Sequence, residues 1–412
     1  MASLDNEKQK KEEIETIIRH WVRELKIKLG WINDFDRLVV KYVMFFFAAS
    51  FFMFDTFRLS SKSLKIFTGH TNSVNSIDYS TFDGSQFICS GSYDRTVRVW
   101  NVETAKETNI LTGHLFSVYC VKFSPYHYYN YSRNVICASS DDKSIRFWDI
   151  KDHRPFRRFN GHSEGVRNIE FSPFNNGRYF CSGSCDKTIR LWDVETSDTL
   201  HVFNGHKNVV YCVDISPLQS NNNKKDKSNS IGVIGGNGYT MCSGSYDTTI
   251  RTWDIEMTKQ LIVFEGHDNI VWSVKYGSNE LGISGGANTI LSGSSDTSVR
   301  LWDMRSGKQI QVFNGHTNSV WAVEYSPFVV DNGKVGGSSN VICSGSKDNT
   351  IRFWDIRSNK KQLYVVKETH GDNIGIVCLK FLRSNNNKNS DYSRCGINLC
   401  FGSFKGLIHI WG

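Results

Sequence analysis

The chain lacks the sequence features that mark several large classes of protein. Its 412 residues include only 5 prolines, and its 11 cysteines form no Cys-x-x-Cys pair. An odd cysteine count without such pairs argues against a disulfide framework or a zinc site. The main apolar run, residues 42–54, is shorter than the roughly 20 residues that a membrane-spanning helix needs. No HExxH, GxSxG or phosphate-binding glycine loop is present, so the sequence offers no catalytic motif.

What the chain does contain is a repeat. Six Gly-His pairs are each followed, after a similar interval, by Trp-Asp or Trp-Asn. The histidines of these pairs are His70, His114, His162, His206, His267 and His316. The tryptophans are Trp100, Trp148, Trp192, Trp253, Trp302 and Trp354. Between them, segments such as Val74–Tyr79 alternate apolar and polar residues, which predicts strands. Self-similarity at this period indicates a repeat architecture.

These motifs resemble the WD-repeat family over residues 63–412. The resemblance implies an all-β fold, a seven-bladed β-propeller of four-stranded blades. The seventh unit ends at Trp411 and is followed only by Gly412, so its fourth strand is missing. Ser63–Phe67 can supply that strand, because pairing the two chain ends removes exposed sheet edges. We therefore predict N-terminal strand closure, with an extension at 1–62 and a propeller at 63–412.

An aspartate stands six residues before each of the six tryptophans. These residues are Asp94, Asp142, Asp186, Asp247, Asp296 and Asp348. The resemblance implies that each accepts a hydrogen bond from its Gly-His imidazole, and that a second-strand serine and the indole extend the network. A buried imidazole and carboxylate are costly alone, so we expect the pairs to lock the turns. Six identical pairs around a ring indicate a scaffold, and we predict no enzyme, cofactor or metal. In the seventh unit Lys405 takes the aspartate position and His370 is displaced.

The candidate binding site is the mouth of the central channel on the Gly-His face. The resemblance implies that the residue after the first valine of each innermost strand faces this mouth. Those residues are Asn75, Tyr119, Arg167, Tyr211, Trp272, Trp321 and, with a shifted alignment, Val377. The residues just before each turn aspartate also vary, and they include Tyr93, Tyr246, Lys347 and Phe404. Aromatic residues and arginine dominate protein-binding hot spots, so these residues are candidates for binding a protein or peptide. The alternative is that they line the channel without binding a ligand.

The N-terminal extension leaves three alternatives open. Residues 14–29 and 34–46 carry apolar side chains at helical spacing, which predicts two amphipathic helices. They could pack on the propeller or on a partner. A 20-residue stretch at 38–57 includes Lys41 and Asp55, so membrane association is the second alternative and disorder the third. The Asn/Ser/Lys-rich segments 221–230 and 384–390 are expected to be loops, either neutral insertions or partner sites.

The net charge of +8 is spread along the chain. An arginine recurs two residues before each tryptophan, and we expect its stem to pack along a blade face rather than to bind nucleic acid. The first 15 residues are highly charged, so we expect no secretory signal and an intracellular location, cytoplasmic or nuclear.

We predict a non-enzymatic scaffold that binds a peptide or protein and acts as a monomeric propeller within a larger complex. An alternative is a substrate receptor of a cullin-type ubiquitin ligase, because Trp302–Arg305 and Trp354–Arg357 match the WDxR pattern of receptors that dock on the cullin-4 adaptor. Another alternative is a membrane-associated scaffold that uses residues 38–57.

Overall fold

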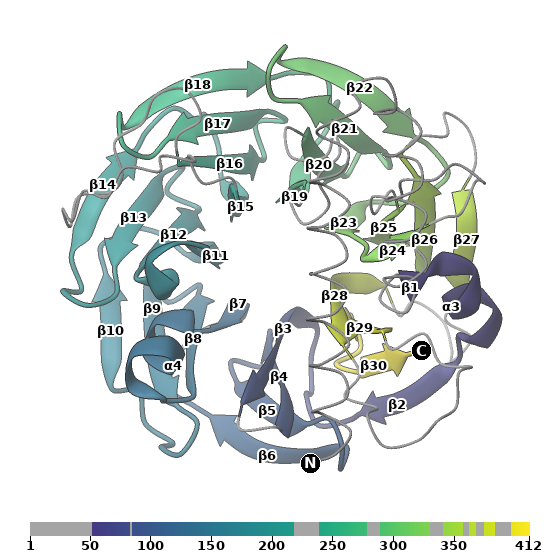
Figure 1. Ribbon diagram of the computed structural model, residues 1–412. Coiled ribbons are helices and arrows are strands. Elements are labelled where there is room, and N and C mark those ends of the chain that lie inside the picture. The colour runs from purple at the N-terminus through teal and green to yellow at the C-terminus, as the bar shows by residue number, and fades with distance from the viewer. Residues whose placement is uncertain are drawn as a thin grey trace, which may run out of the picture. The chain divides into compact units, whose positions relative to one another are not determined.

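The computed structural model describes residues 52–82, 85–217, 239–277, 289–329, 341–356, 362–367, 375–383 and 397–412. Within these residues the backbone forms seven four-stranded antiparallel sheets, which stand as blades around a central opening (Figure 1). The predicted seven-bladed propeller is therefore confirmed.

Each blade runs outward from the opening through four strands, numbered here from first to fourth. The first strands are β3 (Val74–Phe82), β7 (Val118–Phe123), β11 (Val166–Phe171), β15 (Val210–Ile215), β19 (Val271–Tyr276), β23 (Val320–Tyr325) and β28 (Ile376–Arg383). The second strands are β4 (Ser85–Ser92), β8 (Val135–Ser140), β12 (Tyr179–Ser184), β16 (Thr240–Ser245), β20 (Thr289–Ser294), β25 (Val341–Ser346) and β29 (Ile397–Ser403).

The third and fourth strands complete each blade. The third strands are β5 (Val97–Asn101), β9 (Ser144–Asp149), β13 (Ile189–Asp193), β17 (Ile250–Asp254), β21 (Val299–Asp303), β26 (Thr350–Asp355) and β30 (Ile408–Trp411). The fourth strands are β6 (Lys106–Leu111), β10 (Arg157–Asn160), β14 (Thr199–Phe203), β18 (Lys259–Phe264), β22 (Lys308–Phe313), β27 (Gln362–Lys367) and, for blade seven, β2 (Ser63–Phe67).

The core lies between neighbouring blades, because the inner strands bury side chains on both faces of each sheet. Every residue of β8 is buried. Phe147 of blade two packs against Phe180 of blade three, with ring centroids 5.9 Å apart. Burial on both faces favours small apolar residues in the second strands, and six of these strands carry a fully buried cysteine. The ten cysteines among the described residues are all free thiols.

Strand β2 closes the ring as the sequence predicted. It pairs antiparallel with β30, so that Phe67 lies opposite Ile408. Lys62 and Gly412 exchange backbone hydrogen bonds of 3.2 and 3.3 Å beside this pairing. The buried ring of Phe67 then meets Trp100 of blade one edge-on at 5.6 Å. The closing strand thus pairs with blade seven and packs on blade one.

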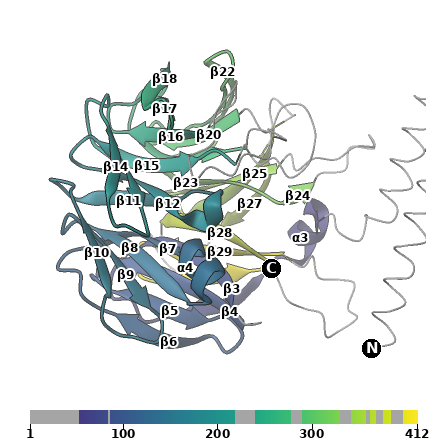
Figure 2. The same cartoon turned by 60° about the vertical axis from the view of Figure 1, so that its left-hand side comes forward.

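Two short elements precede the closing strand. β1 (Phe52–Met53) pairs in parallel with β24 (Phe328–Val329), which follows the first strand of blade six. Helix α3 (Phe54–Ser60) comes next, and Figure 2 shows it beside β24. β1 and α3 thus attach the residues that precede the closing strand to blade six.

Helix α3 is held by two phenylalanines. Phe54 and Phe57 are buried, and their rings lie 5.2 and 5.7 Å from that of Phe353 in blade six. The compact unit that contains the propeller begins at Phe52. The last residues of the apolar stretch 38–57 therefore cover the core of blade six.

Several expectations fall outside the described residues. They are the helices at 14–29 and 34–46, the segments 221–230 and 384–390, His370 and Arg357. Across the residues that the structure describes, no helix is both long enough and apolar enough to cross a membrane.

Candidate protein-interaction site at the channel mouth

Blades one to six each contain a histidine–aspartate pair. The distance from the histidine Nδ1 to the aspartate Oδ2 is between 2.7 and 2.9 Å in every pair. The pairs are His70–Asp94, His114–Asp142, His162–Asp186, His206–Asp247, His267–Asp296 and His316–Asp348. In blade one the Asp94 carboxylate also accepts the backbone N–H of Thr71 at 3.1 Å. One carboxylate thus ties the Gly-His turn to the turn between the second and third strands.

In five of these blades a serine hydroxyl links the histidine to the tryptophan. Ser90 Oγ lies 2.8 Å from both His70 Nε2 and Trp100 Nε1. An indole N–H can only donate, so the hydroxyl accepts from Trp100 and donates to His70 Nε2. The imidazole Nδ1 then carries the proton that is donated to Asp94. The equivalent serines are Ser182, Ser243, Ser292 and Ser344.

Burial and hydrogen bonding set the charges of these pairs. Burial lowers the pKa of four of the imidazoles, those of His162, His206, His267 and His316. Burial also acts to raise the pKa of all six aspartates, but the hydrogen bonds from the histidines outweigh it. The net pKa of each aspartate lies well below its usual value. These four imidazoles are therefore neutral, and all six carboxylates ionised, near pH 7.

Blade two departs from the serine pattern. Ala138 stands where the other blades have the serine, so His114 Nε2 faces the backbone carbonyl of Ala138 at 3.3 Å. Trp148 Nε1 donates instead to the carbonyl of Thr112 at 3.1 Å. The two nitrogens of His114 thus both face oxygen acceptors, and a neutral ring can donate to only one of them.

Blade seven carries none of this network in its described residues. Phe401 stands at the serine position and Lys405 at the aspartate position. Among the described residues, Trp411 Nε1 has no hydrogen-bond partner. Blade seven is held instead by its pairing with β2 and by apolar packing.

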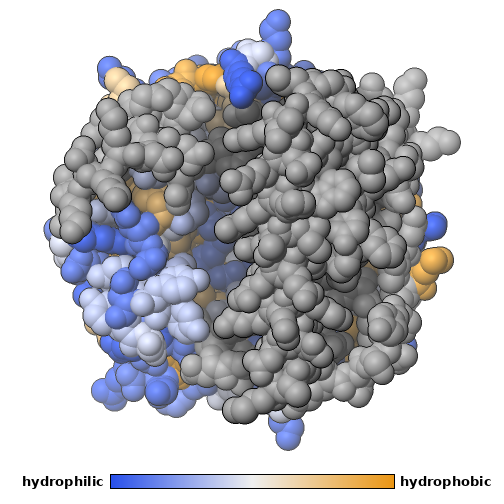
Figure 3. All heavy atoms as spheres, in the orientation of Figure 1, coloured by the Kyte–Doolittle hydropathy of each residue, from blue (hydrophilic) through white to orange (hydrophobic). Residues whose placement is uncertain are grey.

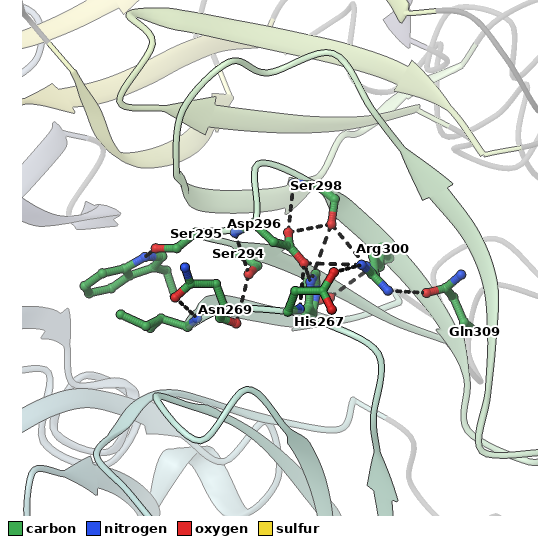
Figure 4. A network of polar contacts seen from close by, with 12 residues as sticks. His267, Asn269, Ser294, Ser295, Asp296, Ser298, Arg300 and Gln309 are labelled. Carbon is green, nitrogen blue, oxygen red and sulfur yellow. Dashed lines mark hydrogen bonds and ion pairs between the residues drawn. The ribbon is translucent and has the colours of Figure 1, made fainter.

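The recurrent arginines cover the Gly-His turns. In blade five, Arg300 contacts Asp296 at 3.3 Å and donates to Gln309 at 2.8 Å (Figure 4). In blade one, a Cβ added to Gly69 would lie only 2.7 Å from Arg98 Nη1, so the position accepts only glycine without rearrangement. In both blades these contacts are made by the guanidinium group of the arginine.

The predicted channel-mouth residues sit at β-bulges. Each first strand shifts register by one residue after its initial valine or isoleucine. The extra residues are Asn75, Tyr119, Arg167, Tyr211, Trp272, Trp321 and Val377. A bulge re-aims a side chain away from the regular pleat. All seven side chains line a central channel with a volume of about 450 Å³.

Five of the predicted residues form a continuous chain of contacts, which we call the aromatic arc. Tyr93 meets Tyr119 edge-on at 5.5 Å. The Arg167 guanidinium lies 3.9 Å above the Tyr119 ring and 5.8 Å from the Tyr211 ring. Tyr211 in turn lies 4.3 Å from Trp272. The aromatic arc therefore spans blades one to five, and Tyr246 extends it at 6.4 Å from Tyr211.

Two fixed polar contacts hold the aromatic arc in place. Trp272 Nε1 donates to Ser295 Oγ at 2.6 Å, and Arg167 Nε donates to Cys185 Sγ at 2.9 Å. Burial raises the pKa of Tyr119 and Tyr211, so both hydroxyls remain protonated donors at neutral pH. These contacts limit how much side-chain entropy a ligand must remove on binding.

Trp321 forms a second cluster on the other side of the mouth. Its ring stacks on Phe404 at 6.1 Å with an interplanar angle of 22°. The Lys347 ammonium lies 5.9 Å from the same ring. The structure thus brings the predicted residues together in two groups around one opening.

Two exposed apolar side chains on the same face were missed by the sequence analysis. Leu115 and Phe116 follow His114 and are 65% and 56% exposed. The corresponding residues of blade one are Thr71 and Asn72. The signal was available, because among the six Gly-His pairs only that of blade two is followed directly by two apolar residues.

A ring of charged side chains inside the channel was also missed. Each first strand contributes one ionisable residue at the same position: Asp78, Lys122, Glu170, Asp214, Lys275, Glu324 and Lys380. Glu170 Oε2 lies 2.7 Å from Lys122 Nζ and 3.6 Å from Lys275 Nζ, which belongs to blade five. Burial acts to raise the pKa of Glu170, but these lysines outweigh it and lower the pKa to about 2. The pair between Glu170 and Lys275 links blades three and five, which are not neighbours in the ring.

The described residues contain little that suggests catalysis. No group of three or more His, Cys, Asp or Glu side chains among them could hold a metal ion. Burial raises the pKa of core thiols such as Cys89 and Cys343, which makes them poor nucleophiles. The imidazoles and carboxylates of the histidine–aspartate pairs are already hydrogen-bonded to each other in the turns.

The seven blades, with histidine–aspartate pairs in six of them and a serine that links the pair to a tryptophan in five, define a propeller of the WD-repeat class. The model of the family "WD domain, G-beta repeat" matches residues 61–101, 105–149, 153–193, 197–254, 258–303 and 307–355. These segments make up more than half of the chain, so the protein belongs to the WD-repeat family.

The matches to individual proteins extend over short segments of the chain. The chain is 35% identical over 63 residues to the peroxisomal targeting signal 2 receptor of Mus musculus, and 42% identical over 64 residues to WD repeat-containing protein 82 of Drosophila melanogaster. Each match covers 15% of this chain and 20% of the relative. It is 38% identical over 50 residues to a probable E3 ubiquitin ligase complex SCF subunit, sconB, of Talaromyces marneffei, covering 12% of this chain and 7% of the relative. The chain thus matches a fifth or less of each relative's length.

Proposed function

We propose that this protein is a non-enzymatic scaffold that binds a peptide or protein segment on its Gly-His face, at the mouth of the central channel. The observation that carries the proposal is the aromatic arc of Tyr93, Tyr119, Arg167, Tyr211 and Trp272, in direct contact from blade to blade. The ring does not require it, because the bulge residue differs between blades whereas the turn networks repeat.

The composition of the mouth suits a protein ligand. Aromatic side chains offer large contact areas and lose little conformational entropy, and arginine pairs well with carboxylates. Leu115, Phe116 and Phe404 are exposed on the same face and extend the apolar area. The proposal includes an intracellular location, since the described cysteines are free thiols, and a single propeller that joins a larger complex.

The decisive experiment compares two triple variants of the full chain in affinity capture with quantitative mass spectrometry. Tyr211→Ala/Trp272→Ala/Trp321→Ala should lose specific partners by about tenfold or more, because hot-spot residues each contribute over 1 kcal/mol. The matched control, Leu200→Ala/Met257→Ala/Leu261→Ala, removes exposed apolar side chains elsewhere and should keep those partners. An identical partner set for both variants, with equal thermal stability, would refute this binding face.

A ubiquitin-ligase receptor is the second candidate, and one observation favours it. Arg305, the extra residue of the first WDxR motif, is exposed, and its side chain makes no ion pair or hydrogen bond among the described residues. The similarity to a probable subunit of an SCF ubiquitin ligase adds support. If the Arg305→Ala/Arg357→Ala variant still co-purifies with the cullin-4 adaptor, this candidate function is excluded.

A further inference from the structure

Blade two carries an aromatic and basic surface at the end of its strands opposite the Gly-His turn. Helix α4 (Pro125–Tyr131) follows the first strand β7, whereas the same connection in blade three holds only the 3₁₀ turn η2 (Asn175–Gly177). The loop between β9 and β10 emerges at the same end, because first and third strands run in parallel. Figure 3 shows the area over α4 as a surface of intermediate hydropathy bordered by hydrophilic residues.

Helix α4 is rigidly anchored. Pro125 occupies its first turn, and the left-handed Ser132 ends it by donating its backbone N–H to the carbonyls of His127 and Tyr128. His127 belongs to this helix and its side chain is buried, with Nδ1 2.8 Å from Ser124 Oγ. Burial and the nearby Arg157 and Arg133 lower the pKa of His127 to about 4, so this side chain is neutral at physiological pH.

Two aromatic rings are held over this buried histidine with their outer faces in solvent. Tyr131 and Phe156 lie 6.3 and 5.6 Å from the His127 ring, and they are 56% and 40% exposed. The Arg133 guanidinium lies 5.0 Å from the Phe156 ring and pairs with Asp149 at 2.9 Å. These side chains therefore present an apolar area that is ordered before any partner binds.

Cations without partners border this area. Lys151 and Arg154 are exposed, and their side chains make no ion pair or hydrogen bond among the described residues. Blades one, three and four carry a glutamate where blade two has Lys151, namely Glu103, Glu195 and Glu256, while blade five has Arg305. Blade six also has an arginine there, Arg357, so the sign of the charge beside the exposed rings is reversed relative to blades one, three and four.

We propose that Tyr131, Arg133, Lys151, Arg154 and Phe156 form a second docking surface, for an acidic protein segment that carries an aromatic or large aliphatic side chain. The apolar side chain packs on Phe156 and Tyr131, and carboxylates pair with Lys151 and Arg154. Charge complementarity selects this partner over a nucleic acid. Asp149 and Asp152 interrupt the basic area, and two unpaired cations match a few carboxylates rather than a continuous phosphate backbone.

The test uses fluorescence anisotropy with the full chain and three labelled probes. The probes are a synthetic peptide of Glu and Asp interspersed with Phe and Leu, the same peptide with Lys in place of the acids, and a single-stranded oligouridine. The acidic peptide should bind, and Phe156→Ala and Arg154→Glu should each weaken its binding about tenfold or more. Met257→Ala and Lys259→Glu, in the equivalent loop and strand of blade four, are the matched controls and should leave binding unchanged.

The outcomes separate this surface from the channel mouth. Tyr211→Ala/Trp272→Ala/Trp321→Ala should leave the acidic peptide bound, and loss of binding in that variant would move the site to the mouth and overturn the proposal. Equal binding of the Lys peptide, tighter binding of oligouridine, no binding of any probe, or insensitivity to both blade-two variants would each overturn it as well.

Discussion

At the scale of single residues, one serine hydroxyl connects the histidine and the tryptophan in five of the six blades that contain a histidine–aspartate pair. In blade one, Ser90 accepts the indole N–H of Trp100 and donates to His70, which leaves the other imidazole nitrogen to donate to Asp94. The direction of every bond follows from the tryptophan, which can only donate. Blade two retains its histidine and tryptophan without this hydroxyl, so it provides a natural comparison within the same molecule.

We expect Ser90→Ala to lower the free energy of unfolding by about 1–3 kcal/mol, because it leaves buried polar atoms of both His70 and Trp100 without a partner. Ala138→Ser should instead restore the bridge in blade two and raise stability by about 0.5–1.5 kcal/mol. Urea denaturation followed by tryptophan fluorescence measures both changes. A destabilised Ala138→Ser variant would show that blade two has repacked around its alanine.

The same networks predict how stability depends on pH. The folded-state pKa values of His162, His206, His267 and His316 lie below the ordinary value of 6.5, so the unfolded chain takes up protons first as the pH falls. Stability should therefore be complete above about pH 7 and decline below about pH 6.5. The aspartates, whose folded pKa values are also lowered, add a second decline below about pH 4. Melting temperatures that stay constant or rise from pH 7 to pH 5 would contradict this.

At the scale of secondary-structure elements, the strands were predictable and their irregularities were not. Alternating residues located strands such as β3, which was predicted at Val74–Tyr79 and runs from Val74 to Phe82. The bulge in β7 cannot be inferred from Tyr119 alone, because a bulge depends on the register with the neighbouring strand. The resemblance to WD repeats placed Tyr119 at the channel mouth, and the bulge provides the physical reason for that placement.

Helix α3 shows what hydropathy alone leaves undetermined. Its phenylalanines belong to an apolar stretch whose length invited a comparison with membrane segments, yet hydropathy does not say what covers a side chain. The structure covers Phe54 and Phe57 with blade six. No local pattern in the sequence encodes that contact, because Phe57 and Phe353 lie at opposite ends of the chain.

We expect Phe57→Ala to lower the free energy of unfolding by about 3–5 kcal/mol, because Phe57 is fully buried in the core of blade six and its removal leaves a cavity. Leu59→Ala on the same helix is the matched control. Leu59 is 80% exposed, so the control should change stability by no more than about 0.5 kcal/mol. Equal denaturation midpoints for Phe57→Ala and Leu59→Ala would show that α3 does not contribute to the propeller's stability.

At the scale of the whole molecule, the ring is held in two ways. Closure by β2 joins its ends, and the sequence predicted this from the missing strand after Trp411. The charged ring in the channel was not predicted, since polar residues in an alternating strand are usually taken to face solvent. Only the circular arrangement brings Glu170 of blade three close to Lys275 of blade five.

The charged ring therefore gives a prediction that belongs to the propeller as a whole. Glu170→Gln should cost about 1.5–3 kcal/mol, because Lys122 and Lys275 lose a shared carboxylate inside the channel. Glu324→Gln, at the same ring position of blade six, is the matched control. The Glu324 side chain makes no hydrogen bond or ion pair among the described residues. The control variant should therefore change the free energy of unfolding by about 0.5 kcal/mol or less. Because the lowered pKa of Glu170 stabilises the fold above its unfolded value of 4.5, the difference between the two variants should shrink as the pH falls from about 4.5 toward 2. Urea denaturation of both variants at pH 7 and pH 3 checks this, and equal losses at pH 7 would show that the ion pairs across the channel do not stabilise the ring.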